Sequence, residues 1–176
     1  MRPFNQKPLK LTNENTLFYA HIGLITVRFA ELESLVSHII EKIINSDDDV
    51  IASTLTEANS LSLNLQLLAK LNRSRRYRED TIKSITKQIN ESRMIRNSLI
   101  HGVWKEVIRD DGELRMLCSN HKHIFEKNYD SGRSWSRYTS EEFTLQNLID
   151  EIAKIDNLLI TLREMWIELN EDDIFW

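Results

Sequence analysis

The stretch Arg96-Asn97-Ser98-Leu99-Ile100-His101-Gly102 ends the clearest helical pattern in the middle of this chain. Before it, apolar residues recur every three or four positions and predict a helix that begins near Glu79 or Asp80. Gly102 then occupies the position after a helix where glycine is favoured. Beyond Gly102, apolar and polar residues alternate, which is typical of strands. The heptapeptide is therefore expected to join a helical part to a small β insert.

Arg96 interrupts the apolar stripe of this predicted helix. At about 100° per residue it falls in the middle of the stripe. A guanidinium on a core-facing stripe is costly unless it is paired or functional. Glu33, or less favourably Glu31, is the carboxylate that the sequence offers to hold it.

His101 and Asn97 complete the candidate site. His101 falls in the last helical turn, where the helix dipole favours an imidazolium. Asn97 lies one turn earlier, close enough to help orient the imidazole. On a regular helix Arg96 and His101 point about 140° apart. One ligand would meet both if the helix loosened at Gly102, if the long arginine reached round, or if a second subunit contributed.

Length and composition indicate one domain with an ordinary core. The chain has 176 residues, of which 41% are hydrophobic, and its net charge of −4 is not that of a protein coated for nucleic acid. One cysteine excludes a disulfide framework within the chain and makes a reducing cytoplasm the simplest location. No apolar run reaches the length of a membrane span, so no membrane partner is expected.

The remaining pattern predicts a mainly α fold over residues 1–176. We expect an up-and-down bundle of about four long helices, with a small antiparallel β insert (103–138) between the third and fourth. The first helix runs to about Asn45, and the second from about Glu57 to Asn72. Val50 to Leu55 suggests one further helical turn.

The ends of the fold have their own signals. The last helix is expected to start at a capping box of Thr139 or Ser140 with Glu142 and to run to about Asn170. Turn signals at Asp110-Asp111-Gly112 and Asp130-Ser131-Gly132 predict two or three strands in the insert. Residues 1–12 form a loose leader, with Thr12 or Asn13 as the first helix cap, and residues 171–176 an acidic, aromatic tail.

The motif helix resembles that of the HEPN domain family. The family signature is an arginine, a polar residue that is often asparagine, three to five further residues and a histidine near a helix end. Arg96, Asn97 and His101 match it, and the wider layout is similar from about residue 14 to 170. The interval from Arg115 to His121 also fits the spacing, but a strand is expected there. Some family toxins carry a tyrosine two residues after the histidine, where this chain has Val103.

This resemblance implies a metal-independent endoribonuclease, either a toxin or an antiphage defence effector. In such a protein two motifs of a homodimer form one composite cleft, and the ribose 2′-OH attacks the adjacent phosphate. Arg96 and His101, with Asn97, would be the catalytic residues and Glu33 a supporting one. The partners implied are an RNA substrate, a second copy of the chain, and an antitoxin or regulatory protein. The alternatives are a non-catalytic HEPN module that binds a partner protein or a nucleotide, and a purely structural helical dimer.

Plainer interpretations stand beside each of these. Arg96 would serve as a core arginine paired with Glu33, and His101 as a helix cap. The basic cluster Arg73, Arg75, Arg76 and Arg78 either contacts an RNA backbone or forms a solvated loop. Cys118, His121 and His123 do not match a common zinc spacing, so neither metal nor cofactor is expected.

Overall fold

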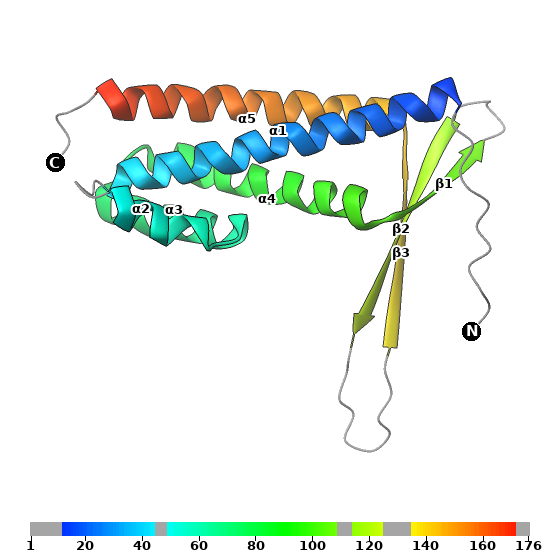
Figure 1. The fold of residues 1–176 in the computed structure, drawn as a ribbon, viewed down its shortest axis with the longest axis horizontal. Coiled ribbons are helices and arrows are strands. Elements are labelled where there is room, and N and C mark those ends of the chain that lie inside the picture. The colour runs from blue at the N-terminus through cyan, green and yellow to red at the C-terminus, as the bar shows by residue number, and fades with distance from the viewer. Residues whose placement is uncertain (1–11, 45–48, 109–113, 125–134, 172–176) are drawn as a thin grey trace, which may run out of the picture.

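The structure is a computed structural model that describes residues 12–44, 49–108, 114–124 and 135–171. It contains five helices in this part of the chain: α1 (Asn13–Ile44), α2 (Asp49–Glu57), α3 (Leu61–Arg75), α4 (Glu79–His101) and α5 (Leu145–Glu171). Three strands, β1 (Val103–Ile108), β2 (Leu114–Ile124) and β3 (Trp135–Phe143), lie between α4 and α5 in the sequence (Figure 1). The expectation of a mostly helical chain with a small antiparallel sheet is confirmed.

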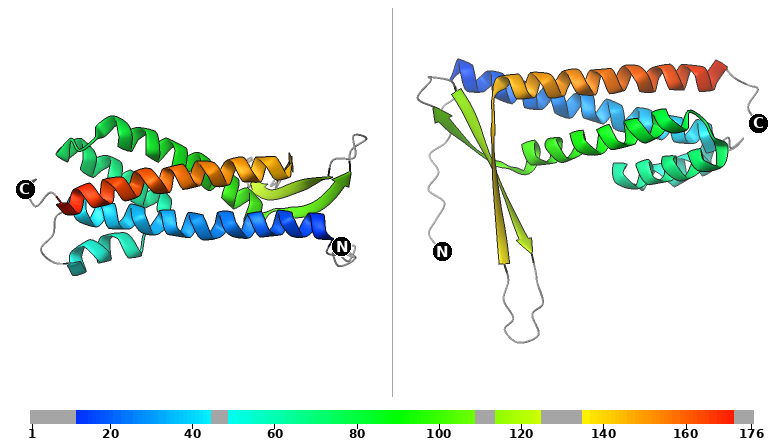
Figure 2. Two further views of the ribbon diagram at one scale, coloured as in Figure 1. Left: turned by 90° about the horizontal axis from the view of Figure 1, so that it is seen from above. Right: turned by 180° about the vertical axis from the view of Figure 1, so that it is seen from behind.

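The two longest helices form one layer. α1 and α5 run parallel and side by side, as Figures 1 and 2 show from three directions. Two ion pairs record the same alignment, because Arg28 of α1 meets Asp156 and Glu31 meets Arg163 further along both helices. α4 packs against one side of the α1–α5 pair, and α2 and α3 lie on the same side near the N-terminal end of α4.

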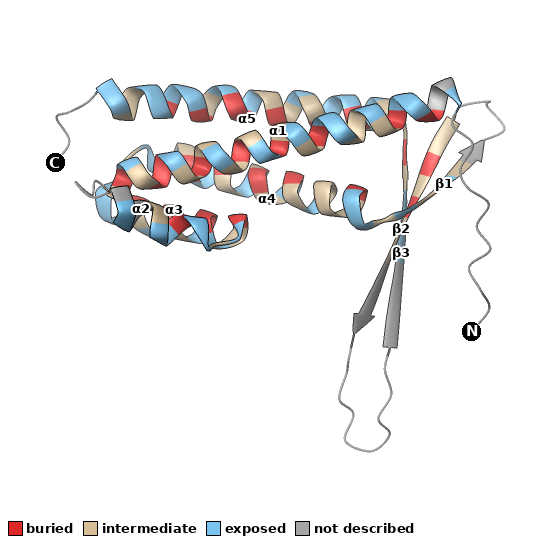
Figure 3. Ribbon diagram, viewed as in Figure 1, coloured by how far each residue is buried: buried red, intermediate tan, exposed pale blue. Residues whose placement is uncertain are grey.

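The core lies between these layers. Periodic apolar residues of α1 supply more of its fully buried side chains than any other element does, and the inward stripes of α4 and α5 cover them (Figure 3). The largest of these α1 side chains are Phe18, Ile25, Phe29, Leu32, Ile39, Ile40 and Ile43. Arg96 of α4 faces this core at Phe29, as its place on the stripe predicts.

The sheet has the order β1-β2-β3, with both pairs antiparallel. Val103 pairs with Ser119 at the start of β1, and Met116 pairs with Phe143 at the end of β3. β2 and β3 continue together away from the helices (Figure 1). The predicted change of period at Gly102 is thus confirmed. The two predicted turn sequences, 110–112 and 130–132, the leader 1–11 and the tail 172–176 lie outside the described residues.

Several predicted boundaries differ from the structure. α2 is a nine-residue helix rather than a single turn, and α3 begins at Leu61 and ends at Arg75, later than predicted at both ends. α1, α4 and α5 are long, whereas α3 has 15 residues, so the described part holds three long helices and two short ones.

The predicted cap of the last helix is wrong. Thr139 and Ser140 belong to β3, which continues to Phe143, and the cap is Thr144 instead. The Thr144 backbone N–H donates to Asn147 Oδ1 at 2.8 Å, and the Asn147 N–H donates to Thr144 Oγ1 at 3.2 Å. α1 begins in the same way, with Thr12 and Asn15, as predicted for Thr12. Each is a reciprocal capping box in which asparagine replaces the usual glutamate.

Candidate functional site

Arg96 lies half-buried on α4 against α1. Its guanidinium carbon is 5.7 Å from the centre of the Phe29 ring, a cation–π distance. Nη1 donates to Asn97 Oδ1 at 3.1 Å, while the buried Nε has no hydrogen-bond partner. The asparagine of the motif therefore contacts the arginine, whereas the sequence placed it near His101. The guanidinium is held in position but retains unused donors.

Arg96 has no carboxylate partner within the described part of the chain. The ion pairs there include none from Arg96 to Glu33 or Glu31. Glu31 is instead bound by Arg28, at 3.2 Å, and by Arg163. The hydrogen bond from Arg163 is the main cause that lowers the pKa of Glu31, helped by Arg28. The structure thus leaves Arg96 unpaired where the plainer interpretation expects an ion pair with Glu33.

A second arginine, which the sequence reasoning missed, lies beside the first. Arg93 precedes Arg96 by one helical turn, is half-buried, and has a buried Nε without a hydrogen-bond partner. Residues three apart on a helix are neighbours on its surface. No ion pair of the described residues involves Arg93. Two half-buried cations without counter-ions therefore lie one turn apart, a combination suited to an anion.

His101 is the exposed last residue of α4. The helix remains regular as far as His101 and ends at Gly102, where φ is −78° and ψ is 151°, so the change of backbone at Gly102 does not turn His101 toward Arg96. At about 1.5 Å and 100° per residue, Arg96 and His101 are separated by about 7.5 Å along the axis and 140° around it. Arg96 faces α1 while His101 faces outward. A single phosphate meets both only through the length of the arginine or through a second subunit.

The end of α4 is tied to the sheet. Ser98 O accepts the Gly102 N–H at 3.0 Å and the Cys118 thiol at 3.1 Å. Leu99 O accepts the indole N–H of Trp104 at 2.9 Å. These bonds satisfy carbonyls that a helix end leaves open, and they fix the backbone on both sides of His101.

Gly102 is required here for close packing. Its φ of −78° is ordinary for any residue, so the expected glycine-specific helix stop is not what the structure uses. A Cβ at this position would overlap Cys118 Sγ and lie 2.7 Å from Ser98 O. Burial of Cys118 raises the pKa of its thiol, which stays protonated as the donor to Ser98 O.

The predicted basic cluster lies at the other end of α4. Arg73 and Arg75 belong to the last turn of α3, and Arg76 and Arg78 adopt left-handed backbone conformations in the turn to α4. Arg78 is paired with Glu168 of α5 at 2.6 Å. Because α4 has 23 residues, this cluster is about 30 Å along the helix from His101. The structure does not bring the cluster and the motif together in one chain.

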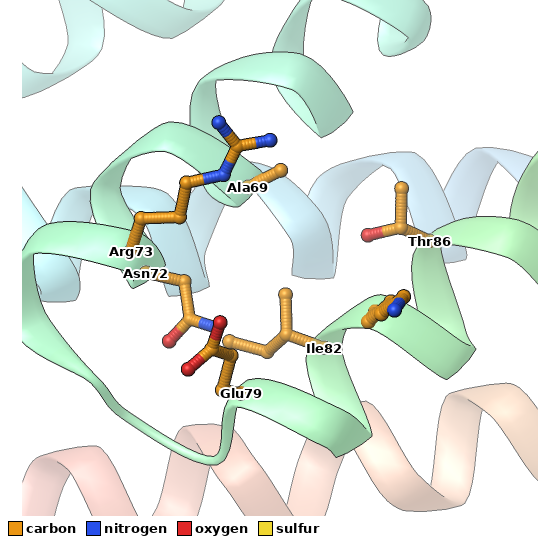
Figure 4. Close-up of a pocket in the computed structure, with 7 residues that line it drawn as sticks. Ala69, Asn72, Arg73, Glu79, Ile82 and Thr86 are labelled. Carbon is orange, nitrogen blue, oxygen red and sulfur yellow. The ribbon is translucent and has the colours of Figure 1, made fainter.

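A hollow of about 260 Å³ lies between α3 and α4, near the basic cluster (Figure 4). Ala69 and Ile82 supply its apolar part, and Arg73, Lys83 and Glu79 are exposed around it. Its remaining lining residues, Asn72 and Thr86, carry buried oxygen atoms without hydrogen-bond partners. It contains none of the predicted catalytic residues.

Arg115 lies in β2, as the strand expectation required, so its spacing to His121 is not a helix-end motif. The described residues contain no group of three His, Cys, Asp or Glu side chains placed to hold a metal. The side chains of His121 and His123 fall outside that description. No helix in the described ranges combines the length and apolarity needed to cross a bilayer.

Comparison with known proteins gives no family assignment: no protein-family model matches the chain, and neither a curated protein nor a solved structure was found to be similar to it.

Proposed function

We propose that this protein is a metal-independent endoribonuclease of the HEPN type. The observation that carries the proposal is the pair of half-buried guanidinium groups, Arg93 and Arg96, on the helix that ends at His101. Leaving cations half-buried without a carboxylate is unfavourable. A phosphate bound between them would supply the missing charge, and arginine donors fit phosphate oxygens well. The resemblance of the Arg96–His101 motif to the family supports the same assignment.

The proposed reaction needs only the chain, the RNA and solvent water. The ribose 2′-oxygen attacks the adjacent phosphorus, gives its proton to a water molecule, and displaces the 5′-oxygen of the next nucleotide. Arg96, oriented by Phe29 and Asn97, neutralises charge on the phosphoryl oxygens, with Arg93 beside it. His101 donates a proton to the departing 5′-oxygen as general acid. The products are a 2′,3′-cyclic phosphate and a 5′-hydroxyl.

We propose that the complete site is shared between two copies of the chain. Arg96 and His101 point in different directions on one regular α4, so one copy presents the two groups poorly to a single phosphate. A second α4 across a two-fold axis would place the histidine of one copy opposite the arginine of the other. Met94, which is 66% exposed, shares the outward face of His101, whereas Arg96 lies about 160° around the helix and would reach this contact only through the length of its side chain.

Within this proposal the biological setting is a cytoplasmic toxin or antiphage effector that an antitoxin or regulatory protein restrains. The single cysteine, which is reduced and buried, fits a reducing compartment. The basic cluster at the far end of α4 is left as a secondary RNA contact, through Arg73 and Arg76 rather than the ion-paired Arg78.

The test is cleavage of total RNA by the purified protein in EDTA. Wild type should cleave, and His101→Ala and Arg96→Ala should lose roughly 10²–10³-fold in rate. Arg93→Ala should lose less, because its neighbour remains. Lys83→Ala, which removes an exposed cation from the same helix far from the motif, is the matched control and should keep full activity. An inert wild type would favour the non-catalytic module that binds a partner protein or a nucleotide.

A further inference from the structure

The outer face of the α1–α5 layer carries several exposed aliphatic side chains. Seen from above, α1 and α5 lie side by side in front of the other helices, and no described element covers them (Figure 2). Six large aliphatic side chains on these two helices are exposed: Leu17, Leu24, Val27, Ile149, Ile160 and Ile167. On each helix they recur at spacings that keep them on the side turned away from the core. We call these six residues the α1–α5 face.

The exposure at the centre of this face is large. Val27 is 65% exposed and Ile160 is 51% exposed. Single exposed aliphatic residues are ordinary on a protein surface, but six of them on one uncovered two-helix layer mark a candidate interaction site. The face is uncovered along the two longest helices of the fold, so a partner bound there would bury a large surface area.

The charges within the face cancel. Arg28, Glu31, Asp156 and Arg163 form a line of ion pairs along the groove between the helices. Two of these residues are positive and two are negative, although the chain as a whole carries −4. A second copy would therefore meet this face without like-charge repulsion, and a strongly basic or acidic partner would gain little from it.

The size of the face also matches a dimer contact. α5 has 27 residues and is about 40 Å long, and two adjacent helices are about 20 Å wide, which gives a surface of about 800 Å². A standard stable interface buries about 800 Å² on each partner. We propose that the α1–α5 face is a self-association surface that packs against the same face of a second copy, related by a two-fold axis.

This surface is separate from the motif contact proposed above. α1 and α5 present it on the side opposite α2, α3 and α4, whereas Met94 and His101 lie on α4 itself. One copy therefore has room to use both contacts, and each can be removed without touching the other.

The experiment measures mass by light scattering on the full chain at about 100 µM, well above a micromolar Kd. The double variant Val27→Arg/Ile160→Arg places two cations at the centre of the α1–α5 face. Arginine is a better helix former than valine or isoleucine, and both positions are exposed, so the chain should keep its circular dichroism. Leu63→Arg is the matched control, because it makes the same change at an exposed residue of α3, outside both proposed contacts.

Wild type should have at least twice the 20.8 kDa mass of one chain, and the double variant should have half the wild-type mass. Leu63→Arg should leave the wild-type mass unchanged. A monomeric wild type would overturn the inference, as would a double variant of unchanged mass. A monomeric wild type whose melting temperature falls in the double variant would show that a segment of the same chain covers the face, which also overturns it.

Discussion

Replacing Gly102 by alanine should destabilise the junction between α4 and the sheet. The backbone at Gly102 accepts any residue, with φ at −78°, so the effect is entirely steric. The new Cβ would lie 2.7 Å from Ser98 O and would overlap Cys118 Sγ. The helix end and β2 would have to separate, and this would break the hydrogen bond from the Cys118 thiol to Ser98 O.

The magnitude follows from these two effects. Overpacking a tight site costs about 1–3 kcal/mol and losing the buried hydrogen bond about 1 kcal/mol, so unfolding free energy should fall by about 2–4 kcal/mol. For a chain of this size that corresponds to a melting temperature lower by about 5–15 °C. Urea denaturation and calorimetry measure the two quantities.

Two further variants separate the steric cause from others. Gly23→Ala is the control, because a Cβ there meets nothing within 4 Å in the interior of α1, and it should stabilise by about 0.5–1 kcal/mol. Cys118→Ala in the Gly102→Ala background removes the overlapping sulfur and should show a favourable coupling of about 1 kcal/mol. A Gly102→Ala protein within about 0.5 kcal/mol of wild type, or strictly additive variants, would refute the reasoning.

Three other predictions follow from the caps and the titrating groups. Thr144→Ala should lower the unfolding free energy by about 0.5–2 kcal/mol, and Thr139→Ala, at the wrongly predicted cap, should lower it by less. Urea midpoints that rank the two variants the other way would contradict Thr144 as the cap. Because Cys118 is buried and the pKa of its thiol is raised, native protein should react with iodoacetamide at pH 8 more slowly than unfolded protein. Stability should fall as pH rises above about 8.5, the pKa of an unfolded thiol. Equal alkylation rates would contradict the burial of Cys118. Because the pKa of Glu31 is lowered, its contribution to the unfolding free energy is present above about pH 4.3 and is lost as pH falls through the folded pKa. Glu31→Gln should therefore flatten the decline of the urea midpoint between pH 5 and 3. An unchanged decline would count against the ion pairs of Glu31.

The sequence predicted what periodicity controls. The length and helicity of α1, the switch of period at Gly102 and the place of Arg96 on the inward face of α4 were all readable, because each depends on residue spacing alone. Thr12 was also identified as a cap. The Thr144 cap was missed because asparagine stands where the usual motif has glutamate or glutamine.

Tertiary contacts account for the rest. The reason for Gly102, its close approach to Cys118, joins residues that are distant in sequence. Trp104 as the donor to Leu99 O depends on where β1 turns away from α4. The spacing of Arg93 and Arg96 could be read from the sequence. Their lack of a counter-ion could not, because it depends on where the fold puts the carboxylates. Glu31, the less favoured of the two candidate partners, is held by Arg163 of α5.

The most direct test of the proposed function is the identity of the ends produced on a defined RNA oligonucleotide. In EDTA, wild type should leave a 2′,3′-cyclic phosphate on one fragment and a 5′-hydroxyl on the other, both detectable by mass spectrometry. The same oligonucleotide with 2′-deoxy sugars should remain intact, and His101→Ala should leave the RNA uncut. Cleavage of the 2′-deoxy strand, or fragments that carry a 5′-phosphate, would contradict attack by the 2′-oxygen and with it the role given to Arg96 and His101.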